Sequence, residues 1–73
     1  MTQNLPASLR LEVNGKPVTA QAETLADLLR HLALEASAVV AEVNGLIVPR
    51  ENFARHPLKN GDTIELVRFV GGG

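Results

Sequence analysis

The sequence contains no cysteine, tryptophan or tyrosine, and its aromatic residues are two phenylalanines. Without cysteine the chain has no disulfide, no thiolate ligand for zinc and no cysteine nucleophile, so packing alone must hold the 73-residue fold together. Without tryptophan or tyrosine it lacks the usual platform on which single-stranded nucleic acids stack. These absences argue against a disulfide scaffold, a thiol enzyme and a nucleic-acid-binding module.

The chain also has no large excess of positive or negative charge. Seven Lys and Arg residues are set against eight Asp and Glu residues, which gives a net charge of -1 and no polybasic run for anionic membranes or nucleic acid. No apolar run approaches the roughly 18 residues of a membrane span. The first ten residues have neither the charged region nor the apolar region of a secretion signal. We therefore expect a single small cytoplasmic domain.

Alternating apolar residues predict two strands near the N-terminus, over residues 9–13 and 18–22. Asn14 and Gly15 lie between them, and both residue types tolerate the positive φ of a tight hairpin turn. Pro17 lacks a backbone N–H and therefore favours an edge position for the second strand.

A helix is predicted to follow, with Thr24 as its N-cap and Asp27 as the acidic partner of a capping box. It should end before residues 34–37. Its apolar residues recur at intervals of three and four, which is typical of a helix with one buried face. They are Leu25, Leu28, Leu29 and Leu32.

Three further strands are predicted over residues 39–43, 46–48 and 63–70, with Asn44 and Gly45 in a second hairpin turn. Residues 51–56 are expected to form one helical turn with Phe53 facing inward. Because a single helix cannot cover two sheets, the order of elements predicts an α+β fold, in which the helix crosses one face of a single sheet of about five strands.

The chain ends in Gly71, Gly72 and Gly73, directly after the apolar run of residues 67–70. Three glycines form poor helix or strand, so we expect a flexible tail. Glycine also lets a backbone enter a channel too narrow for side chains, and it leaves the terminal carboxylate accessible. This arrangement suits a protein whose reactive group is its own C-terminus.

Five segments together resemble the sulfur carrier proteins of the ubiquitin-like β-grasp group, most closely the ThiS family of thiamine biosynthesis. Together with the predicted strand before the first of them, the segments span residues 9–73. They are Val13-Asn14-Gly15, Thr24 to Leu29, Val43 to Arg50, Leu58 to Asp62, and Ile64 to Gly73. The resemblance implies a mixed sheet in a β-grasp domain over residues 9–70 and a C-terminal tail over residues 71–73. Residues 1–8 form an N-terminal extension, in which the chain departs from the family pattern.

The resemblance also implies a function without catalysis by the chain itself. An adenylating enzyme of the ubiquitin-activating type would use MgATP to activate the carboxylate of Gly73. A cysteine desulfurase route would then supply sulfur, giving a thiocarboxylate that donates sulfur to thiazole synthase. Gly71 and Gly72 would thread into the partner's active site, and the carrier itself would bind no cofactor or metal.

A carrier needs a docking surface beside its reactive end. The apolar residues Val67, Phe69 and Val70 are candidates, because packing in the core explains only part of such a run. Arg50 is either a solvated loop cation or a contact with a partner. His31 and His56 are interpreted as ordinary surface or capping residues, since neither has a second ligand at helical spacing.

Two alternative functions stay open from the sequence. One is the small subunit of molybdopterin synthase, a similar carrier with the same glycine end. The other is a ubiquitin-like modifier or binding domain, whose tail forms an amide with lysines or has no reaction.

Overall fold

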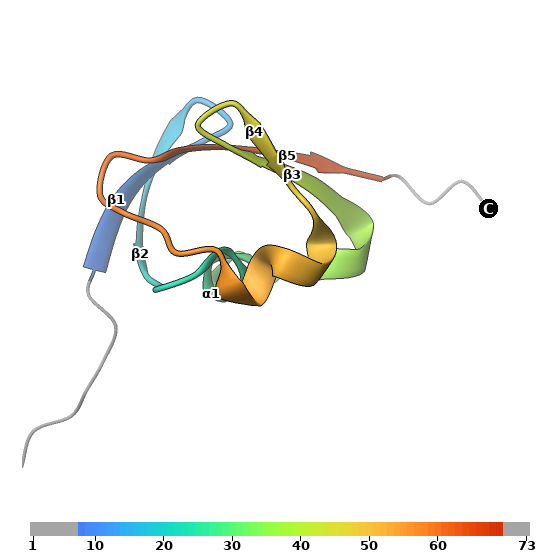
Figure 1. The fold of residues 1–73 in the computed structure, drawn as a ribbon. Helices are drawn as coiled ribbons and strands as arrows, with labels where there is room; N and C mark the ends of the chain where they lie inside the picture. Colours follow the sequence, from blue (N-terminus) through green and yellow to red (C-terminus); the bar gives the residue numbers. More distant parts are fainter. Residues whose placement is uncertain (1–7, 70–73) are drawn as a thin grey trace, which may run out of the picture.

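A computed structural model describes residues 8–69 (Figure 1). Its sheet has five strands: β1 (Ser8–Val13), β2 (Lys16–Gln21), β3 (Val39–Val43), β4 (Leu46–Val48) and β5 (Thr63–Arg68). One α-helix, α1 (Leu25–His31), and two 3₁₀ helices, η1 (Ala36–Ala38) and η2 (Arg50–Arg55), complete the described elements.

The sheet is mixed, with the strand order β2-β1-β5-β3-β4. β5 lies in the middle, where it pairs parallel to β1 and antiparallel to β3. Figure 1 shows α1 and η2 on the same side of this sheet. The predicted β-grasp arrangement is therefore confirmed, and β2 lies at an edge, as Pro17 indicated.

The core lies between the sheet and α1. Leu28 is 0% exposed and Leu29 is 2% exposed, and they belong to one apolar cluster with alternate residues of β1, β3 and β5. Phe53 of η2 closes the same cluster, as predicted. The buried strand residues include Leu11, Val13, Val39, Ala41, Val43, Ile64 and Leu66. Buried residues alternate with more exposed ones along β1, β3 and the first four residues of β5, and this leaves the other face of the sheet uncovered within the described part of the chain.

Both ends of α1 are built from local hydrogen bonds. The Thr24 hydroxyl accepts from the backbone N–H of Asp27, and the Asp27 carboxylate accepts from the backbone of Thr24, so the predicted capping box is present. At the other end, the N–H of Leu34 donates to the carbonyl of Leu29 at 2.9 Å, across Ala33 with a φ of 59°. This Schellman-type bond ends the helix at His31.

Candidate functional site

The strand that leads to the glycine tail is held from both sides. β5 is the central strand, and beyond Ile64 its ladder to β1 stops, because β1 turns away at Val13. The Asn14 side chain continues the pairing: its amide nitrogen donates to the carbonyl of Leu66 at 3.1 Å, and its oxygen accepts from the N–H of Leu66 at 2.8 Å. One side chain thus substitutes for the next residue of β1.

The second hairpin turn contacts the start of β5 in a similar way. The Asn44 oxygen accepts from the N–H of Thr63 at 2.9 Å, and its amide nitrogen donates to the Asp62 carboxylate at 3.0 Å. Asp62 is 7% exposed, and its other oxygen accepts from the N–H of Lys59. The two turn asparagines fix β5 within the sheet and so fix the place where the chain leaves it.

Two of the predicted docking residues lie on the uncovered face of the sheet. Val67 of β5 is 61% exposed, and Phe69, which follows β5 directly and lies two residues after Val67, is 57% exposed. Val40 of β3 lies directly opposite Val67 and is 37% exposed. We call Val40, Val67 and Phe69 the tail-side patch, because β5 leaves the sheet beside them (Figure 1).

Arg50 lies at the same end of the sheet. β4 runs antiparallel to β3, with Val48 opposite Ala41, so Pro49 and Arg50 continue beside the start of β3. Arg50 is exposed and begins η2. Four other predicted site residues, Val70 and Gly71 to Gly73, lie outside the described residues.

The register also brings together two carboxylates that the sequence did not single out. Glu42 of β3 and Glu65 of β5 are direct partners across the strands, on the same face as the tail-side patch. In the sequence, Glu42 is visible only as the one charge in the run of residues 39–43. Finding the pair requires the pairing of β3 with β5, which strand patterns alone do not give.

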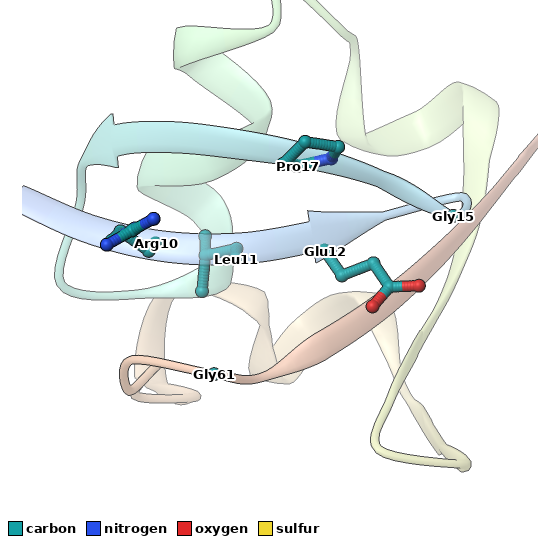
Figure 2. Close-up of a pocket in the computed structure, with 6 residues that line it drawn as sticks. All are labelled: Arg10, Leu11, Glu12, Gly15, Pro17 and Gly61. Atoms are coloured by element: carbon teal, nitrogen blue, oxygen red, sulfur yellow. The ribbon is translucent and has the colours of Figure 1, made fainter.

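An open groove of about 320 Å³ lies along β1, between the first hairpin turn and the residues that precede β5. Arg10, Leu11, Glu12, Gly15, Pro17 and Gly61 line it (Figure 2). Gly61 lies about six residues, or roughly 20 Å, from Val67 along the strand, whereas Gly15 directly follows Asn14, whose side chain bonds Leu66.

Residues 8–69 contain no group of three or more His, Cys, Asp or Glu side chains arranged to hold a metal ion. His31 ends α1 and His56 follows η2, and they belong to separate elements. None of the described helices is long and apolar enough to cross a membrane.

Comparison with known proteins identifies the family. The ThiS family model matches residues 4–73. The sulfur carrier protein ThiS of Bacillus subtilis (strain 168) is 40% identical over 65 residues, covering 86% of this chain and 98% of that protein. A thiazole synthase of Paramagnetospirillum magneticum is 35% identical over 66 residues, covering 89% of this chain. The match spans only 20% of that thiazole synthase, so the likeness concerns one segment of it.

The fold agrees with a solved structure of the same family. The crystal structure of the thiamine biosynthesis protein (ThiS) from Geobacter metallireducens superimposes with a TM-score of 0.74 at 40% identity, covering 89% of this chain and 100% of that one. These relatives favour the thiamine branch over the molybdopterin branch and a carrier over an enzyme. The chain belongs to the ThiS family, the sulfur carriers of thiamine biosynthesis.

Proposed function

We propose that this chain carries sulfur as a thiocarboxylate on Gly73. A carboxylate oxygen of Gly73 attacks the α-phosphate of MgATP on an adenylating enzyme, and pyrophosphate leaves. Sulfur from a cysteine desulfurase route then attacks the acyl carbon, and AMP leaves. ATP and magnesium belong to the adenylating enzyme, and the carrier contributes the acyl group.

The observation that carries this proposal is the extent of the family match, which runs through the glycine end to Gly73. The absence of cysteine supports it, because the chain has no thiol that could carry the sulfur instead. The fixed course of β5 supports it as well. Asn14 and Asn44 hold the strand that precedes the tail, so the folded head defines the point from which the tail extends.

Docking is assigned to the tail-side patch, with Val70 and Arg50 as neighbouring contacts. An exposed valine pair next to an exposed phenylalanine is the kind of apolar surface that partners bury. Arg50 is exposed at the same end of the sheet, at the start of η2 on the α1 side, and we assign it as a further contact with the partner. Gly71 and Gly72 would then thread toward the partner's active site.

Thiazole synthase is the proposed acceptor of the sulfur. Support comes from the thiazole synthase that contains a segment similar to this chain, because joining the two in one polypeptide keeps them in proximity. The carrier would bind thiazole synthase through the same end of the sheet that it presents to the adenylating enzyme, since both enzymes must reach Gly73.

The test compares three chains in ATP–pyrophosphate exchange with the cognate adenylating enzyme: the full chain, a chain ending at Gly72 and a chain with one residue added after Gly73. An extended residue spans about 3.3–3.6 Å, so either change misplaces the carboxylate by that distance. A misplacement of about 1 Å can cost roughly 10²-fold in rate, so both altered chains should lose exchange.

The same reaction with a sulfur source should raise the intact mass of the full chain by the exchange of one oxygen for one sulfur. Urea unfolding of the three chains serves as the control and should give equal midpoints. Near-normal exchange by the chain ending at Gly72 would contradict the length argument. Near-normal exchange by the extended chain would contradict activation at the C-terminus, and a ladder of conjugates would indicate a protein modifier.

A further inference from the structure

Glu42 and Glu65 face each other across the centre of the uncovered sheet face. The N–H of Asn44 donates to the carbonyl of Thr63 at 2.7 Å, and that of Phe69 donates to the carbonyl of Ala38 at 2.8 Å. Hydrogen-bonded pairs alternate in an antiparallel ladder, so Glu42 and Glu65 form such a pair, with their Cβ atoms about 5 Å apart. Like charges in this position destabilise a sheet.

Within residues 8–69, no Lys or Arg side chain forms an ion pair with Glu42 or Glu65. All seven Lys and Arg residues lie within residues 8–69, and the ion pair found there joins Arg30 to Asp27, away from this face. Glu12 of β1 lies on the same face opposite Thr63, and Arg10 lies two residues before it on that face. Among the described residues, Glu42 and Glu65 therefore have no ion-pair partner, and like charges directly opposite each other oppose the pairing of their strands.

The pair adjoins the tail-side patch. Val40 and Val67 lie two residues along β3 and β5, or about 7 Å, from Glu42 and Glu65. A partner that covers the patch also displaces water from the two carboxylates. Removing water from an unpaired charge is costly, so an uncharged partner surface would bind this face poorly. The partner must bring a cation to this position.

We propose that Glu42 and Glu65 together receive one basic side chain of thiazole synthase, which docks beside the tail-side patch; this rests on the proposed function. A guanidinium is the fitting group, because its planar set of five N–H donors can contact two carboxylates at once. Ile47, 66% exposed and opposite Glu42 on β4, extends the apolar surface beyond the pair. The acidic pair thus determines the position in which thiazole synthase docks, and the tail-side patch provides the apolar contact area.

The test uses Glu42→Gln, Glu65→Gln and the double variant, with Glu23→Gln as the matched control. The Glu23 side chain is exposed, lies between β2 and α1 and has no side-chain hydrogen bond among the described residues. Titration calorimetry measures the affinity of each carrier for the cognate thiazole synthase. Urea unfolding measures the stability of each free carrier at low and high salt.

Each single Gln variant should bind thiazole synthase at least about tenfold more weakly, because the partner's buried cation loses part of its pairing. The same variants should have an equal or higher urea midpoint when free, and the gain should fade at high salt, which screens the repulsion. Glu23→Gln should change neither quantity.

Unchanged or tighter binding by the Gln variants would overturn the inference while leaving the proposed function intact. Weaker binding together with a lower urea midpoint would also overturn it, since the pair would then have a structural role. If the wild-type carrier does not bind thiazole synthase, the assignment of that enzyme as acceptor fails, and the inference fails with it.

Discussion

At the scale of single residues, a positive φ has different consequences at two positions. Asn14 has a φ of 50° and Ala33 a φ of 59°, both in the left-handed region that glycine adopts most easily. Asn14 makes two side-chain hydrogen bonds to the backbone of β5, whereas Ala33 offers only a methyl group. Backbone conformation alone therefore does not explain the asparagine.

We expect Asn14→Gly to lower the free energy of unfolding by about 1–2 kcal/mol, because the N–H and carbonyl of Leu66 lose their protein partner. Ala33→Gly is the matched control, and it should stabilise the protein by about 0.5–1 kcal/mol, because the left-handed conformation costs alanine more. Urea denaturation measures both values. If the Asn14→Gly variant is as stable as the wild type, the side-chain hydrogen bonds of Asn14 do not stabilise the fold, and only its backbone conformation matters.

At the scale of elements, α1 depends on its first turn. The helix has only seven residues, so propensity alone would not hold it, and packing and capping must do so. The Asp27 carboxylate accepts hydrogen bonds from the backbone N–H groups of Glu23 and Thr24 and from the guanidinium of Arg30. These bonds hold the pKa of Asp27 below its ordinary value of 3.8, although burial acts in the opposite direction.

A carboxylate whose pKa is lower in the folded state than in the unfolded state stabilises the fold at pH values above the unfolded pKa. That contribution is lost as the pH falls through the folded pKa. We therefore expect Asp27→Asn to lower the free energy of unfolding by about 0.3–1 kcal/mol near neutral pH, and the difference from wild type to shrink below pH 3.8. Urea unfolding as a function of pH tests this, and a difference independent of pH would contradict it.

At the scale of the whole molecule, one face of the sheet forms the core and the other remains available for partners. The core face is covered by α1 and η2, while the tail-side patch lies on the uncovered face at the end where β5 leaves the sheet (Figure 1). This division lets binding residues change with little effect on stability, because their side chains pack against few neighbours in the free protein.

Phe69→Ser should therefore weaken association with the adenylating enzyme more than it weakens the fold. The Phe69 side chain is 57% exposed, so we expect the free energy of unfolding to change by about 0.5 kcal/mol or less. Loss of a central aromatic contact should cost about 2 kcal/mol or more in binding. Calorimetry and urea unfolding on the same preparations compare the two, and unchanged affinity would remove Phe69 from the interface.

The sequence by itself determined the local structure and the family. Hairpin turns at Asn14 and Asn44 and the capping box at Thr24 were predictable, because turns and caps depend on neighbours a few residues away. The motifs from residue 9 to Gly73 were sufficient for the ThiS resemblance, which the family match over residues 4–73 confirms.

Only the tertiary structure decided which distant residues meet. Asn14 bonds Leu66, 52 positions away, and Glu42 faces Glu65, because the strand order puts β5 between β1 and β3. Alternation along a strand assigns each side chain to a face, but it does not give the register between strands, which is set when the two hairpins and α1 pack into one core. The hydrogen bonds from Asn14 and Asn44 that hold β5, and the pairing of Glu42 with Glu65, both depend on that register.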